Sequence, residues 1–395
     1  MSPPPEAAAD AAAMYTAYVS DVSYYSGKLE AYLRYAGIAH RRVEINTRVM
    51  YRTILPATGF MKVPCMQCPD GRWLKDTTPM IAWLDARHGA PSIYPDDPAQ
   101  RFLALLVEDY ADEWLWRPAM YYRWNFGDSH GLLRRRLGRD LSAGTWHSSA
   151  LLGWFMRWRQ YFVYVRGDGV RPHNEHEVQA IYARTLEQLG ALLRDRPFLL
   201  GSRPSIVDFG FFASMFRHFA LDPHSAKQMV DTAPAVYAWV ARLWNARAET
   251  TGVSAFEHFD APAWDAVFAE IGRDYLPYLD ANAQAYANGV RRFDLRLSRA
   301  AYPRVPVVRY RVACREQLLK AWRALSADAQ QSVLSRLTDS GVSDWLRTAT
   351  DVPAGLDAEF QLPLAQRYPG ARWFGLRVMQ GTPWDLPQPP IDDSK

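Results

Sequence analysis

The chain has 395 residues, of which 49% are hydrophobic and 13% aromatic, so it is long enough to bury the cores of two or three domains. The net charge of +4 comes from arginines scattered among acids, which argues against a nucleic-acid-binding protein. Because no apolar stretch reaches membrane-span length and three cysteines are too few for a disulfide framework, we expect a cytoplasmic protein without a membrane partner.

The first part of the chain alternates between extended and helical patterns. Residues 1–13 lack both a basic start and an apolar core, so they predict a disordered tail and not a signal peptide. Residues 15–20 alternate as a strand does, 26–35 form an amphipathic helix that ends near Gly37, and 41–45 form a second strand. This order predicts a β–α–β unit.

The most informative stretch is residues 60–85, FMKVPCMQCPDGRWLKDTTPMIAWLD. Val63-Pro64 precedes a short strand, the turn sequence at 69–72 and another strand. Asp76 and Thr77 then open a helix, whose N-terminus offers free N–H groups and a positive dipole end to a carboxylate. Each piece alone is ordinary, since Asp-Thr is a common helix cap. Their fixed order predicts a ligand site.

Two cysteines in this stretch, Cys65 and Cys68, form a CxxC pair. They follow the proline on a strand, where residues three apart face opposite sides. The chain contains no second pair that would complete a zinc site. We therefore expect no redox or metal role for them.

A linker and a helical region follow. Residues 91–98 are rich in Pro and Asp, as interdomain linkers are, and the pattern from 99 to about 245 is helical throughout. Ser205 and Asp208 have capping-box spacing, in which the hydroxyl bonds an amide and the acid reaches back. The helix that they open is apolar nearly all round, so it is expected to be buried. Asp208 is therefore expected to serve folding and not chemistry.

Residues 255–395 form an additional region without a recognisable catalytic group. A long helix over 264–289 contains Pro277, where we expect a kink. The tail over 369–395 is rich in Pro, Gly and Asp and is expected to wrap the surface. Between them the pattern indicates two strands and two helices: 293–297, 306–312, 314–325 and 327–337.

The stretch at 60–85 and the box at 205–208 resemble the two domains of glutathione transferases. This resemblance covers residues 14 to about 250. It implies a thioredoxin-like α/β domain over 14–90 and an all-helical domain over 99–250, followed by the mostly helical extension over 255–395. It also implies a cis peptide bond between Val63 and Pro64.

The resemblance also implies how glutathione, the co-substrate of this family, would be bound. The backbone of Val63, held by Pro64, would meet the cysteinyl part of the peptide. Asp76 would bind the ammonium group of the γ-glutamyl residue, and Thr77 would bind its carboxylate. No metal is implied.

Glutathione chemistry needs a thiolate, because a thiol is a poor nucleophile at neutral pH. In the serine and cysteine classes of the family, the group that stabilises the thiolate lies five positions before a basic residue. That residue is Lys28 here, which implies Ser23. Tyr24 and Tyr25 are alternatives, and Ser26 is a further candidate that is expected to cap the helix. All four are also ordinary turn or cap residues.

One predicted helix of the second domain is crowded with aromatic residues. The family places its hydrophobic substrate pocket beside this helix. We expect Trp114, Arg117 and Tyr121 to line a pocket for a flat apolar electrophile, while about half of the aromatic residues pack in the core.

The resemblance thus implies a homodimeric, cytoplasmic glutathione transferase, as used in detoxification. It would conjugate or substitute the glutathione thiolate onto a small hydrophobic electrophile, and aryl-ether cleavage is a variant of this chemistry. The alternative is a transferase-like binding or assembly protein without turnover. The extension favours that alternative, as does Tyr24-Tyr25 in place of the Pro or Cys often found beside the serine.

Overall fold

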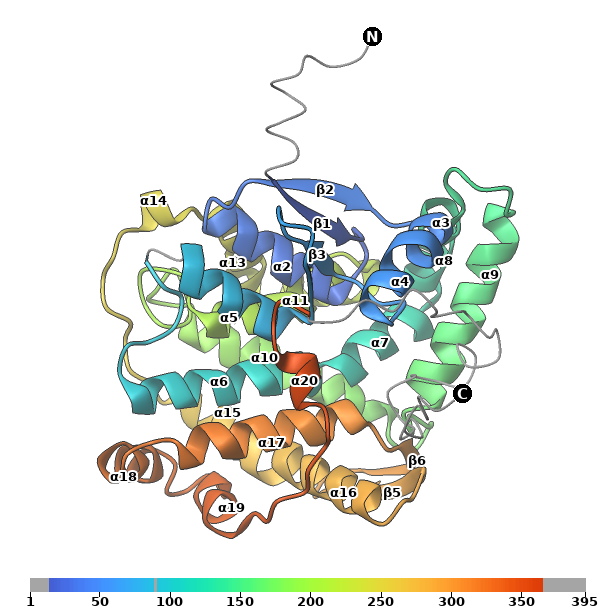
Figure 1. The fold of residues 1–395 in the computed structure, drawn as a ribbon. Helices are drawn as coiled ribbons and strands as arrows, with labels where there is room; N and C mark the ends of the chain where they lie inside the picture. Colours follow the sequence, from blue (N-terminus) through green and yellow to red (C-terminus); the bar gives the residue numbers. More distant parts are fainter. Residues whose placement is uncertain (1–13, 89–90, 365–395) are drawn as a thin grey trace, which may run out of the picture.

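The computed structural model describes residues 14–88 and 91–364, arranged as Figure 1 shows. The N-terminal part contains a four-stranded sheet in the order β2-β1-β3-β4. Strands β1 and β2 run parallel, whereas β3 and β4 are antiparallel to their neighbours. The strands are β1 (Tyr15–Val19), β2 (His40–Glu44), β3 (Cys65–Gln67) and β4 (Trp73–Lys75).

Helices cover both faces of this sheet, because successive strand residues point to opposite faces. Ala17 and Met66 belong to the core that includes α2 (Tyr24–Tyr35) and α5 (Thr77–His88), whereas Tyr18 belongs to a second apolar cluster. That second cluster is covered by three short turns: α3 (Thr47–Val49), η1 (Met50–Ile54) and α4 (Leu55–Thr58). This is the thioredoxin-like arrangement that the sequence predicts.

The second part is helical and is built around α11 (Ile206–Ser214), which is buried along its whole length. The predicted capping box of Ser205 and Asp208 is confirmed. The Asp208 carboxylate also accepts hydrogen bonds from the Leu199 N–H at 2.9 Å and the Trp239 indole N–H at 3.0 Å. The surrounding elements are α6 (Pro98–Glu113), α7 (Trp116–Asn125), α8 (Gly127–Ser142), α9 (Ser149–Gln160), η2 (Tyr161–Arg166), α10 (Glu175–Leu192), η3 (Met215–Phe219), α12 (Pro223–Thr232), α13 (Pro234–Asn245) and α14 (Ala248–Thr251).

Helices α8 and α9 pack closely against each other at one side of the molecule (Figure 1). A Cβ atom placed on Gly138 would lie 2.1 Å from the carbonyl oxygen of Ser149, and one on Gly153 would lie 2.4 Å from that of Arg134. A larger residue at either glycine would push the helices apart. The crossing therefore fixes the position of α9, which forms one wall of the cavity described below.

The extension is mostly helical, as expected, and it packs along α6, with α17 beside it in Figure 1. Buried Glu270 joins it to the helical part, because its carboxylate accepts hydrogen bonds from Tyr110 and Trp114 and pairs with Arg184 at 3.0 Å. Its elements are α15 (Ala263–Glu270), η4 (Ile271–Tyr275), α16 (Leu276–Ala287), β5 (Arg292–Arg296), β6 (Ala301–Pro306), α17 (Arg309–Arg323), α18 (Ala327–Arg336), α19 (Val342–Thr348) and α20 (Asp357–Phe360).

The predicted long helix over 264–289 is present as the continuous run of α15, η4 and α16, and Pro277 lies inside it. The π-helical turn η4 lies just before Pro277, which is one of the places where helices kink. One expectation for the extension needs correction. The strand predicted at 306–312 is wrong. The strand lies at 301–306 instead, because a short turn brings Ala301 opposite Arg296 of the preceding strand.

Some expectations fall outside the described part of the chain, namely the tails at 1–13 and 369–395. The boundaries proposed between the domains stay a prediction. Across residues 14–88 and 91–364, no helix combines the length and apolar character needed to cross a membrane.

Candidate functional site

A cavity of about 1250 Å³ lies where the N-terminal part, the helices α7 to α9 and the start of the extension meet. Its lining includes every residue that the sequence suggested for glutathione and thiol activation except Ser26: Ser23, Tyr24, Tyr25, Val63, Pro64, Asp76 and Thr77. The cavity therefore collects residues from the loop after β1, the approach to β3 and the start of α5.

Ser23 is the N-cap of α2 and is half-buried at the cavity. Its hydroxyl oxygen accepts a hydrogen bond from the Ser26 N–H at 3.3 Å, which leaves the hydroxyl proton available as a donor. The positive end of the α2 dipole also favours an anion here. Ser26, which was expected to cap the helix, is instead fully buried and accepts a hydrogen bond from the Ser20 N–H at 3.2 Å.

Both alternative tyrosines direct their hydroxyl groups away from Ser23, toward the end of α6. The Tyr24 hydroxyl donates to the Ala111 carbonyl at 3.0 Å, and the Tyr25 hydroxyl lies 3.2 Å from both the Asp112 carbonyl and a Glu113 carboxylate oxygen. Burial raises the pKa of both phenols well above its usual value. Each phenol thus stays protonated with its proton already engaged.

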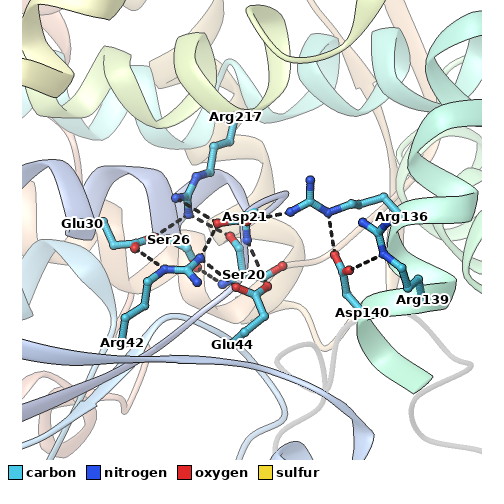
Figure 2. A network of polar contacts seen from close by, with 10 residues as sticks. All are labelled: Ser20, Asp21, Ser26, Glu30, Arg42, Glu44, Arg136, Arg139, Asp140 and Arg217. Atoms are coloured by element: carbon cyan, nitrogen blue, oxygen red, sulfur yellow. Dashed lines mark hydrogen bonds and ion pairs between the residues drawn. The ribbon is translucent and has the colours of Figure 1, made fainter. Parts of the chain in front are cut away.

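The loop that carries Ser23 is held by a network of ion pairs (Figure 2). Asp21 in this loop pairs with Arg42 of β2, with Arg136 of α8 at 2.6 Å and with Arg217 of η3 at 3.6 Å. Arg217 also donates to the Ser20 carbonyl at 2.8 Å. Because these partners come from three elements, the loop is fixed to both the sheet and the helical part.

Besides Arg217, Arg123 also holds the backbone of this loop, and it does so from the cavity side. Arg123 of α7 donates to the Val22 carbonyl at 2.6 Å and forms a buried ion pair with Asp222 at 2.7 Å. It also donates to Nε2 of His218 at 2.7 Å. Burial, together with the charge of Arg123, lowers the pKa of His218 well below its usual value, so the ring is neutral. Arg217 and Arg123 thus hold the backbone carbonyl groups on either side of Asp21.

The approach to β3 leaves backbone groups outside the sheet. The Val63–Pro64 peptide bond is cis, which confirms the prediction. The pairing of β3 with β1 begins with Cys65 opposite Tyr18, so Val63 lies beyond the ladder, and it lines the cavity.

Asp76 stands directly before α5 with a left-handed backbone, at φ 68°. Such a conformation is uncommon outside glycine and is often found at functional sites. Enclosure of the carboxyl group raises the pKa of Asp76 to about 6, although a hydrogen bond with Tyr310 and the charge of Lys28 oppose this rise. Thr77, buried at the first position of α5, lies next to it in the lining.

Lys28, which served to locate Ser23, does not face the cavity. Its ammonium group is fully buried and pairs with Glu108 and Asp112 of α6, while Thr78 lies 3.3 Å away. A buried ammonium group needs such partners, because desolvation would otherwise make it unstable. Lys28 thus ties α2 to α6 beneath the site.

The apolar part of the cavity uses a different face of α7 from the one expected. Trp114, Arg117 and Tyr121 are buried and absent from its lining. Trp114 donates to Glu270 at 3.0 Å, Arg117 pairs with Asp168 at 2.8 Å and Tyr121 lies 3.3 Å from Glu175. The lining residues of α7 follow helical spacing on another face: Trp116, Met120, Arg123 and Trp124.

A further part of the wall is formed by α9 and η2, next to α7. Phe155, Trp158 and Phe162 line the cavity and remain between 40% and 51% exposed. Large aromatic side chains that are left half in contact with water supply apolar area to a ligand. This wall therefore suits a bulky hydrophobic molecule.

The extension also lines the cavity, which the sequence did not predict. Tyr310 and Arg311 at the start of α17 take part, together with Leu356 and Phe360. Arg311 donates to Glu113 at 2.9 Å, the same carboxylate that accepts from Tyr25. No motif in the sequence indicates these contacts, because they join segments far apart in the chain.

None of the three cysteines is among the described residues that line the cavity. Cys65, Cys68 and Cys314 are buried and unpaired. Burial raises the pKa of Cys68 to about 11 and raises that of Cys65 as well, so neither is a ready thiolate. Within the described residues no three metal-binding side chains gather.

Comparison with known proteins assigns this arrangement to a family. Residues 22–87 match the model of the glutathione S-transferase N-terminal domain, and residues 172–242 match that of the C-terminal domain. The chain therefore contains regions that match both domains of the glutathione S-transferase family, whose members bind glutathione.

Solved structures that resemble the chain share little sequence with it. A glutathione S-transferase from Rhodospirillum rubrum F11 is 15% identical, with a TM-score of 0.40 over 65% of this chain and 92% of that chain. One from Methylobacterium radiotolerans JCM 2831, in complex with glutathione sulfonate, is 16% identical, with a TM-score of 0.39 over 63% and 97%. Beta-etherase LigF from Sphingobium sp. strain SYK-6 is 15% identical, with a TM-score of 0.41 over 65% and 99%. No curated protein matches the chain.

Proposed function

We propose that this protein is a glutathione transferase that joins the thiolate of glutathione to a bulky hydrophobic electrophile. The observation that supports this proposal is the cavity itself, whose lining includes Ser23, Val63, Asp76 and Thr77 as well as the aromatic side chains of α9 and η2. We call the first group the polar end of the cavity and the second group, with the lining residues of α7, the apolar end. A peptide thiol and an apolar electrophile can therefore be held side by side.

The residues that line the cavity have separate roles in binding glutathione and in activating its thiol. Asp76 and Thr77 bind the γ-glutamyl end, and the backbone of Val63 binds the cysteinyl part. The Ser23 hydroxyl donates a hydrogen bond to the sulfur, which favours the thiolate once the thiol proton has been released to water. A C–S bond then forms at the electrophilic carbon. In a substitution the leaving group departs with its bonding electron pair, and in an addition the substrate takes a proton from water.

We extend the proposal to the setting of the protein. The reducing cytoplasm suits its three unpaired cysteines, and the resemblance to the family suggests a homodimer with a role in detoxification. Light scattering of the purified chain tests the homodimer, because a mass of 45.1 kDa would contradict it.

Calorimetric titration with glutathione, followed by a turnover assay on a panel of aromatic electrophiles that includes an aryl ether, tests the central proposal. We expect binding together with turnover of at least one apolar substrate. Binding without turnover on the whole panel would favour a transferase-like binding or assembly protein. A protein that does not bind glutathione contradicts both functions.

A further inference from the structure

The extension reaches the end of the cavity that we assign to glutathione. Tyr310, in the first turn of α17, lines the same cavity as Asp76, and the nearby phenol favours the ionised form of that carboxyl group. Its ring stacks on Phe360 of α20, with ring centroids 6.0 Å apart and the planes 28° from parallel. The ring is therefore held from one side in the lining that it shares with Asp76.

The other charged groups near Asp76 already have partners. Lys28 of α2 is paired with Glu108 and Asp112 of α6, and Glu113 of α6 is paired with Arg311 of α17. The charge of Lys28 and the hydrogen bond from Tyr310 favour ionised Asp76, whereas burial and the charges of Glu113 and Glu108 favour the protonated form, with a resulting pKa of about 6.

The Asp76 carboxylate must meet two requirements to bind an ammonium group. A carboxylate binds an ammonium group well only when it is ionised and correctly oriented. Asp76 sits in a left-handed backbone conformation at the edge of a cavity, so its side chain needs a fixed partner. Tyr310 is a neutral donor that supplies this partner without adding a competing positive charge.

We propose that Tyr310 is a positioning residue of the glutathione site: its phenol donates to Asp76 and holds that carboxylate ready for the ammonium group of the γ-glutamyl residue. This role rests on the proposed function. It makes the extension part of the binding site and not an independent appendage. The Tyr310 hydroxyl remains bonded to Asp76 when glutathione binds, since a carboxylate accepts several hydrogen bonds at once.

The test is the affinity for glutathione of Tyr310→Phe, measured by calorimetry between pH 5 and pH 8. The substitution keeps the ring on Phe360 and removes only the donor. Without the phenol donor, Asp76 is protonated at a higher pH, so the pH at which glutathione affinity reaches half of its maximum rises. We expect the affinity to fall about fivefold at pH 6 and less than twofold at pH 8.

Two comparisons make this result specific. Tyr286→Phe removes another extension hydroxyl, which lies 3.4 Å from the Ala354 carbonyl, and is expected to change nothing. In an Asp76→Asn background, Tyr310→Phe is expected to have no further effect, because it acts through Asp76.

An unmoved pH midpoint in Tyr310→Phe, or an undiminished effect in the Asp76→Asn background, overturns the role of Tyr310 and leaves the proposed function standing. If the parent protein does not bind glutathione at any pH, the proposed function fails and the role of Tyr310 fails with it.

Discussion

The two ends of the cavity are built in different ways. At the polar end, Ser23 and Asp76 sit immediately before or at the start of a helix, and two arginines hold the loop before Ser23. At the apolar end, side chains from α7, α9 and η2 meet without any such local constraint.

This difference has a physical cause. A group at a helix start is oriented by its own backbone, so its neighbours in sequence determine where it points. A side chain in a helical wall lines a cavity only if the packing of remote helices turns that face inward. Substitutions at the polar end should therefore change turnover or glutathione affinity, whereas those at the apolar end should change only the affinity for the electrophile.

The largest effect is expected at Ser23. Ser23→Ala removes the donor to the sulfur, so turnover should fall by roughly 10²-fold, while glutathione affinity stays nearly intact. The pH midpoint for thiolate formation in the complex, followed by its ultraviolet absorbance, should rise.

Two variants control this experiment. Ser23→Thr keeps both the hydroxyl and the helix cap, and it should retain most of the activity. Tyr25→Phe removes a hydroxyl that already donates to α6. If Tyr25→Phe abolishes turnover and Ser23→Ala does not, the assignment to serine is wrong.

Asp208→Ala should affect the stability of the fold that holds both ends together. It leaves the buried N–H groups of Leu199, Ser205 and Trp239 without an acceptor, so we expect a loss of about 3 kcal/mol in the free energy of unfolding. Urea denaturation measures it. Asp231→Ala, which removes an exposed pair with Lys227, should change it by less than about 0.5 kcal/mol. Equal losses in the two variants would refute the role of the box.

Asp76 is expected to make glutathione affinity depend on pH. Its pKa of about 6 means that the carboxylate becomes protonated as the pH falls, so glutathione affinity should decrease about tenfold from pH 7 to pH 5. Asp76→Asn should bind about tenfold more weakly at pH 7.5 and should not show this decrease. Isothermal titration at several pH values measures both. Identical profiles would remove Asp76 from the site.

The smallest effect is expected at the apolar end, where α9 offers a matched pair. Trp158 and Trp154 are 51% and 53% exposed on the same helix, but only Trp158 is among the described residues that line the cavity. Trp158→Ala should raise KM for an apolar electrophile about fivefold, with glutathione affinity unchanged. Trp154→Ala should leave both unchanged. Equal effects on KM would mean that α9 is not a wall of the substrate site.

The sequence by itself determined the features that depend on near neighbours in the chain. The hairpin after Val63–Pro64 and the box at Ser205 and Asp208 were predictable, because each depends on interactions among a few successive residues, which local patterns record. The cis bond at Val63–Pro64 was implied by the resemblance to glutathione transferases. The choice between Ser23 and Ser26 as the cap lay within the same short stretch, but burial of Ser26 against the loop decided it.

Only the tertiary structure decided which faces and which remote segments surround the cavity. Helical spacing shows that Trp116 and Arg117 of α7 point in different directions, but not which of them faces the cavity, because that depends on how α7 packs against α10 and η2. The contact between Asp76 and Tyr310 joins the first and last parts of the described chain. No local pattern records it, because it forms only when α17 packs along α6 and brings its first turn to the start of α5.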